Sequence, residues 1–139
     1  MVYRNKVYVA FGGDEDIRYY DIMKAWNKNQ NHNFEFNNAH ELHQARDSST
    51  EESIKRSLKD RLNNSKAFIL LLGKNTRFLY KFVRWEIEMA LKLEIQIIVV
   101  NLNGSKGVDY NLLPPILRNE SFSTVPFKES DIIEELRKI

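Results

Sequence analysis

Hydrophobic and polar positions alternate along this chain with two different periods. Short runs rich in aliphatic and aromatic residues predict strands, whereas apolar residues that recur every three or four positions predict amphipathic helices. The predicted strands cover residues 6–11, 33–37, 66–72, 96–101 and 121–127. The predicted helices cover residues 14 to about 28 and 49 to about 63, the segment FVRWEIEMA from a start between 76 and 81, and residues 131–139. Strands and helices therefore alternate over the whole chain.

The two strands at residues 66–72 and 96–101 are continuous apolar runs, which is typical of strands covered on both faces. Parallel neighbours need crossover connections, which are almost always right-handed. The pattern therefore predicts an α/β, three-layer flavodoxin-like fold with a mainly parallel five-stranded sheet. In such folds ligands bind beyond the carboxyl ends of the strands, so residues 11–16, 73–76 and 101–115 are the loops of interest.

Composition narrows the class of protein. A chain of 139 residues with 42% hydrophobic content is expected to form one domain over residues 1–139. A formal charge of +2, without a long block of either sign, predicts no nucleic-acid partner. There is no cysteine, so neither a disulfide nor a thiol nucleophile can contribute. No apolar run reaches the roughly 18 residues of a membrane span, and no signal peptide is visible, so we expect a cytoplasmic protein without a membrane partner.

Several chemistries are disfavoured by residue type. Residues 40–43 (HELH) lack the spacer of a zinc-binding helix, so no metal site is predicted there. Residues 11–13 (FGG) match neither of the common glycine-rich phosphate-binding patterns. A receiver domain would need a phosphoacceptor aspartate at the end of the third strand, where this chain has Leu72. The sequence therefore favours neither a zinc site, nor a glycine-rich phosphate-binding turn, nor a phosphoacceptor site.

One acidic residue breaks the pattern of the FVRWEIEMA helix. At about 100° per residue, Glu86 projects from the middle of the apolar arc, whereas Glu88 points to solvent. The arc consists of Leu79, Phe82, Val83, Ile87, Ala90 and Leu91. A carboxylate in such a position costs a few kcal/mol unless it is hydrogen-bonded or paired. Either Glu86 pairs with Arg46, Arg84 or a loop amide and serves the fold, or it lies at a cleft where a ligand hydroxyl satisfies it.

The residues around Glu86 resemble a known family. The run SKAFILLLGKNT at residues 65–76, followed by VRWEI at 83–87, is similar to the bacterial TIR-like domains found as the ThsB sensor of Thoeris anti-phage defence. The first strand with Phe11, residues 46–48 (RDS) before the second helix, and residues 98–101 support the resemblance. It covers nearly the whole chain and implies the TIR fold.

The resemblance implies chemistry on NAD as a substrate, with no metal and no cofactor. In catalytic TIR domains a glutamate on the helix after the third strand, preceded four residues earlier by an aromatic residue, engages the ribose next to nicotinamide. Glu86 matches the catalytic position and Phe82 the aromatic one, although Phe82-Val83 replaces the family's usual Trp-Cys pair. Nicotinamide departs as a neutral molecule, and a carboxylate bonded to the ribose diol stabilises the cation left behind.

Further substrate-binding residues are expected around the same edge. The resemblance implies that Phe11 stacks near the nicotinamide, although a core position for this ring stays open. Arg46 would meet a phosphate, or it would pair with an acidic neighbour. Gly12, Asp14 and Asn75 complete the expected substrate-binding set.

The resemblance also implies an output. Thoeris-type TIR proteins, which this chain resembles, convert NAD into a cyclic ADP-ribose-type signal that activates a separate effector protein. The expected activity is therefore that of an NAD glycohydrolase or ADP-ribosyl cyclase, and self-association is left open. The alternative is a non-catalytic TIR interaction or adaptor module, because many TIR domains assemble through their helices and loops.

Overall fold

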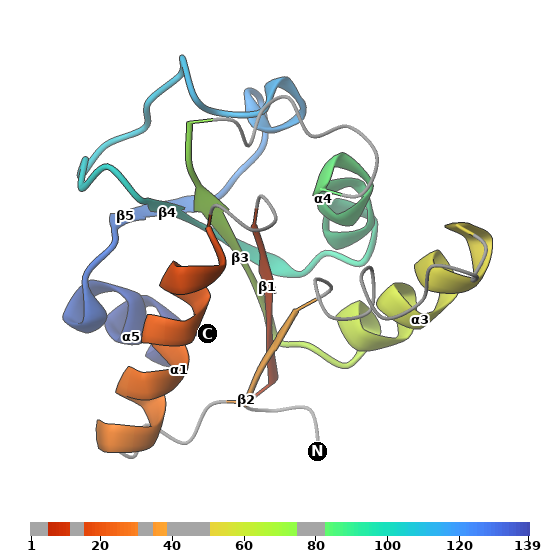
Figure 1. Cartoon of the computed structure of the whole chain (residues 1–139). Helices are drawn as coiled ribbons and strands as arrows, with labels where there is room; N and C mark the ends of the chain where they lie inside the picture. The colour runs from red at the N-terminus through yellow and green to blue at the C-terminus, as the bar shows by residue number, and fades with distance from the viewer. Residues whose placement is uncertain (1–5, 12–15, 31–34, 39–50, 75–82) are drawn as a thin grey trace.

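A five-stranded parallel sheet forms the centre of the chain (Figure 1). The computed structural model describes residues 6–11, 16–30, 35–38, 51–74 and 83–139. The strands are β1 (Lys6–Ala10), β2 (Glu35–Asn38), β3 (Ala67–Leu72), β4 (Gln96–Asn101) and β5 (Ser123–Pro126). Their order is β2-β1-β3-β4-β5, and every pairing is parallel. The predicted α/β fold with a five-stranded parallel sheet is confirmed.

Helices cover both faces of this sheet. They are α1 (Ile17–Gln30), α3 (Glu51–Asn63), α4 (Val83–Lys92), α5 (Glu129–Arg137) and the short 3-10 helix η3 (Pro115–Leu117). Figure 1 shows α1 and α5 on one side of the strands and α3 and α4 on the other. This arrangement is the predicted three-layer architecture. Within the described part of the chain, no helix is both long enough and apolar enough to cross a membrane.

The alternation of side chains along the strands creates two separate hydrophobic cores. Tyr8 and Phe68 point into the core under α3 and α4, which we call the α3/α4 core. Val7 and Ile69 point the opposite way, into the core under α1 and α5, which we call the α1/α5 core. All six residues of β3 are buried, because this central strand is covered on both faces as its continuous apolar sequence predicts.

The two edge strands are short, and their ends differ slightly from the predictions. In β5, Pro126 lies opposite Asn101 of β4, and the next residue, Phe127, donates its backbone N–H to the Asn101 carbonyl at 3.1 Å.

The predicted start of the last helix at residue 131 is wrong. The helix begins at Glu129, because Lys128 is extended and its carbonyl already accepts the first helical hydrogen bond, from Ile132.

Candidate active site

Glu86 lies in the first turn of α4, on the helix face that packs against the sheet. The buried residues of α4 are Val83, Glu86, Ile87 and Ala90, and Glu86 itself is only 2% exposed. Glu88 lies on the outer face, where Arg84 donates to its carboxylate at 3.1 Å. The predicted inward position of Glu86 is therefore confirmed. The predicted pairing of Glu86 with Arg84 is wrong, because Arg84 points outward, one helical turn before Glu88.

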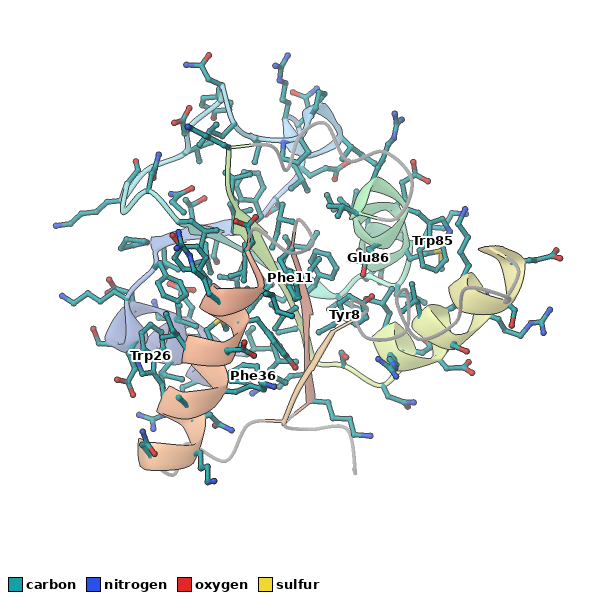
Figure 2. The ribbon with its side chains drawn as sticks, in the orientation of Figure 1. Tyr8, Phe11, Trp26, Phe36, Trp85 and Glu86 are labelled. Carbon is teal, nitrogen blue, oxygen red and sulfur yellow. The ribbon has the colours of Figure 1, made fainter. Side chains whose placement is uncertain are left out.

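The partner of Glu86 is Tyr8, a fully buried residue of β1. The Tyr8 hydroxyl donates a hydrogen bond to Oε2 of Glu86 (Figure 2). The Tyr8 ring is itself held by Phe68 of β3, with ring centroids 5.7 Å apart and planes 8° from parallel. Sequence reasoning missed Tyr8, although a hydroxyl inside the apolar strand KVYVA needs a partner and could have indicated one.

Burial dominates the electrostatics of this pair. It raises the pKa of the Glu86 carboxyl group to about 8, and the hydrogen bond from Tyr8 partly opposes the rise. Burial also raises the pKa of Tyr8 well above its usual value, and the charge of Glu86 adds to that rise, while Arg61 on α3 acts in the opposite direction. Glu86 in the ligand-free chain is thus mostly protonated at neutral pH, and a change in its surroundings can ionise it. Carboxyl groups tuned in this way are frequent at catalytic sites.

A cleft of about 710 Å³ opens at the carboxyl edge of the sheet. It lies between the start of α1, the ends of β3 and β4, and the loop that follows β4. Its polar and aromatic lining comprises Asp16, Arg18, Tyr19, Lys74, Asn103 and Asp109. The size is that of an ordinary small-molecule site, and the predicted loops at residues 11–16, 73–76 and 101–115 all contribute to it.

Gly73 forms part of the cleft directly after β3. A Cβ atom at this position would lie 2.9 Å from Oδ2 and 3.2 Å from Oδ1 of Asp16. The separation of 2.9 Å is shorter than real Cβ atoms show, so the Asp16 carboxylate can lie this close to the end of β3 only with glycine at residue 73. The position of the Asp16 carboxylate against the end of β3 therefore depends on the absence of a side chain at residue 73.

Asn101 holds the loop that brings the other side of the cleft into place. This residue ends β4 and is 1% exposed. Its Nδ2 donates to the carbonyls of Ser105 at 2.8 Å and Gly107 at 2.9 Å. The turn between Asn101 and Ser105 contains Gly104 with a φ of 82°, a conformation that glycine adopts without strain. Sequence reasoning gave Asn101 no role, although a polar residue ending the apolar run QIIVV was a usable signal.

Phe11 lies on the other side of the sheet from Glu86. Its ring stacks on Tyr20 of α1 with centroids 5.5 Å apart, and it belongs to the α1/α5 core with 8% of its surface exposed. Tyr8 and Phe11 are separated by an odd number of positions, so their side chains leave the strand on opposite faces. The structure therefore gives Phe11 a core position, and its stacking on nicotinamide stays a prediction.

The remaining predicted site residues cannot be placed. Gly12, Asp14, Arg46, Asn75 and Phe82 lie outside the described residues. Their expected contacts with the substrate therefore stay predictions.

A comparison with protein families identifies the class of this fold. The family model of the Thoeris protein ThsB, TIR-like domain, matches residues 8–107. The matched segment begins at Tyr8 and contains Glu86, so it includes both members of the buried pair. The chain belongs to the ThsB family of TIR-like domains. In this TIR-like domain, β5 and α5 lie beyond the matched segment, where they complete the sheet and the α1/α5 core.

Proposed function

We propose that this TIR-like domain cleaves the nicotinamide–ribose bond of NAD and that Glu86 is its catalytic residue. The observation that carries the proposal is the placement of one carboxyl group inside the α3/α4 core. Among the described residues it has a hydroxyl partner and no cationic one. A fold gains little stability from a core acid that has no cationic partner, so a chemical role is the better explanation.

The charge of the substrate suits this carboxyl group. The nicotinamide ring of NAD is a cation, and a cation beside a buried carboxyl group favours its ionised form. Substrate binding would therefore lower the pKa of Glu86 from about 8 and generate the carboxylate where it is needed. When the bond to ribose breaks, its electron pair leaves with nicotinamide, which becomes neutral. The positive charge passes to the ribose, where the Glu86 carboxylate stabilises it through the ribose hydroxyls.

The cleft would hold the rest of the dinucleotide, because Glu86 itself is not among the described residues that line it. Glu86 is in the first turn of α4, and a helix that follows a parallel strand starts at the carboxyl edge of the sheet. The cleft lies at the same edge and has Lys74 and Arg18 in its lining, two cations suited to a pyrophosphate. We place the ribose at Glu86 and pair the pyrophosphate with Lys74 and Arg18 rather than with the end of β3 at Gly73, where the Asp16 carboxylate would repel it.

We further propose that the product is a cyclic ADP-ribose-type signal in cytoplasmic anti-phage defence, read by a separate effector protein. Cyclisation requires the adenine to reach the anomeric carbon while water is excluded. Membership in the Thoeris family supports a defence role. Hydrolysis to linear ADP-ribose is the competing outcome at the same site.

The direct test compares Glu86→Gln with Glu88→Gln. Both variants replace a carboxylate by its amide on the same helix, but Glu88 lies on the outer face and pairs with Arg84. Purified proteins would be incubated with NAD, with and without lysate of phage-infected cells as a trigger, and released nicotinamide would be measured. We expect Glu86→Gln to lose at least about 100-fold in rate, because the charge that stabilises the ribose cation is gone, and Glu88→Gln to retain activity.

Measurements of folding and of the reaction products decide between an enzyme and an adaptor module, and between a cyclase and a hydrolase. Thermal melting must show that Glu86→Gln is folded, and retained turnover in that folded protein would contradict the catalytic assignment. Absence of nicotinamide release from the triggered wild type would favour an adaptor module. Small molecules filtered from infected cells that express the active chain would then be added to a candidate effector. An inert filtrate together with collapse of cellular NAD would identify a hydrolase rather than a signalling cyclase.

A further inference from the structure

The group that holds the Glu86 carboxyl comes from the interior of the sheet and not from a loop. Tyr8 lies in the middle of β1, which is hydrogen-bonded to β2 on one side and β3 on the other. Its position in the register is directly opposite Phe68, and the two rings stack. A hydroxyl supported by two paired strands has little freedom to move, so it can hold a second group in a defined place.

The hydrogen bond occupies one of the two carboxyl oxygens. Tyr8 donates to Oε2 of Glu86, and within the described ranges the structure records no hydrogen bond to Oε1. The ribose of NAD presents two neighbouring hydroxyl groups, each able to donate a hydrogen bond. We propose that Tyr8 is the positioning residue of the active site: its hydroxyl holds Oε2 of Glu86 and leaves Oε1 to accept hydrogen bonds from the ribose. This inference rests on the proposed function.

The same hydrogen bond also affects the charge of Glu86. A hydroxyl that donates to a carboxylate stabilises the ionised form, and Tyr8 accordingly lowers the pKa of Glu86 against the larger opposite effect of burial. In the described part of the chain, the other charge acting on the pair is that of Arg61 on α3, through Tyr8. The remaining charged groups of α4 near this position, Arg84 and Glu88, pair with each other on the outer face. Removing the Tyr8 hydroxyl should therefore make Glu86 harder to ionise.

The test is Tyr8→Phe with Tyr20→Phe as its matched control. Both changes remove one buried hydroxyl and keep the ring. Tyr20 is 4% exposed and donates to the Phe36 carbonyl at 3.1 Å, in the α1/α5 core on the opposite face from Glu86. Ionisation of Glu86 would be followed by NMR in protein carrying 13C at the glutamate carboxyl groups, with the signal assigned by its loss in Glu86→Gln. This readout does not depend on NAD cleavage.

We expect Tyr8→Phe to raise the midpoint of the Glu86 titration by about one pH unit, the size expected for one hydrogen bond to a charged group. Tyr20→Phe should leave the midpoint unchanged. In the cleavage assay, the acid limb of the pH–rate profile of Tyr8→Phe should move to higher pH by the same amount. At neutral pH, the cleavage rate kcat should fall by a larger factor than KM changes.

An unchanged midpoint in folded Tyr8→Phe would overturn the inference. Should that variant not fold, wild-type protein carrying 13C at the tyrosine Cζ atoms gives a second measurement: the Tyr8 signal should shift with the midpoint of the Glu86 titration, and a Tyr8 signal that ignores this titration would overturn the inference equally. A shifted midpoint in a chain whose wild type releases no nicotinamide would separate the two proposals: the proposed function would fail, and the hold of Tyr8 on Glu86 would stand. A shifted midpoint with a shifted pH profile supports both.

Discussion

The carboxylate of Asp16 packs against Gly73 so closely that a single added carbon at residue 73 would lie 2.9 Å from Oδ2. The contact joins the start of α1 to the end of β3, two segments that both line the cleft at the carboxyl edge. A methyl group at residue 73 would therefore test whether this cleft binds the substrate.

Gly73→Ala should raise the KM for NAD several-fold while lowering stability by only about 1 kcal/mol, because Asp16 can turn aside into the cleft. Nicotinamide release and urea unfolding would measure the two effects. Gly107→Ala is the matched control, since a Cβ there meets no atom within 4 Å. An unchanged KM in folded Gly73→Ala would show that the substrate does not use this part of the cleft.

The buried Glu86 makes stability depend on pH in an unusual direction. Its pKa is about 8 in the folded chain against an ordinary value of 4.5, so between these values the folded state binds more protons than the unfolded state. The stabilisation is therefore fully present below about pH 4.5 and is lost as the pH rises to about 8. Each pH unit corresponds to about 1.4 kcal/mol, so the loss amounts to several kcal/mol.

Urea unfolding at about pH 5 and about pH 9 should show this loss in the wild type and in Glu88→Gln. Glu86→Gln should lack it, because an amide does not titrate. Comparison of the variants cancels the contributions of other titrating groups. Identical pH dependence in Glu86→Gln and the wild type would contradict the raised pKa of Glu86.

Asn101→Asp should destabilise the fold by about 2–4 kcal/mol, because a carboxylate would replace the amide that donates to two carbonyls and would be buried beside them. Urea unfolding measures the loss. Asn103→Asp is the control: its Oδ1 accepts from the Ser105 backbone N–H at 2.9 Å, and aspartate keeps that acceptor. Equal stability of the two variants would mean that the Asn101 amide does not hold the loop.

Phe11→Ala should lower the free energy of unfolding by about 3–5 kcal/mol, as expected for loss of a buried ring that packs on Tyr20. Phe11→Leu should cost about 1 kcal/mol and remain folded. Because Phe11 packs into the α1/α5 core, we expect the Leu variant to keep its KM for NAD, contrary to the stacking role that the family resemblance implies. A raised KM in folded Phe11→Leu would instead return Phe11 to the substrate site.

Local sequence patterns predicted the central parts of the fold well. The apolar runs that became β3 and β4 are buried as expected, because a strand covered on both faces leaves a continuous signal in the sequence. Helical periodicity was also sufficient to place Glu86 on the inner face of α4. The start of α5 was missed because it depends on the extended backbone of Lys128, which no side-chain pattern encodes.

The contacts of the candidate site could be predicted only in part. The hydrogen bond between Tyr8 and Glu86 joins residues 78 positions apart, and it depends on how α4 packs on the sheet. Sequence reasoning therefore named Arg46, Arg84 or a loop amide as the partner. Arg84 pairs with Glu88 instead, and Arg46 lies outside the described residues. The core position of Phe11 was left open for a similar reason, because a buried ring and a ligand-stacking ring give the same pattern at the end of a strand.

Pro126 has a consequence for how copies of this domain can associate. Phe127 directs its N–H toward β4, so the backbone nitrogen of Pro126 faces the open edge of the sheet, where proline offers no donor. β5 is only four residues long, and a strand of a neighbouring chain that paired with it would lack a backbone hydrogen bond at Pro126. Growth of a filament by strand addition is thus disfavoured at β5, and any assembly on this side has to be built from side-chain contacts of helices and loops.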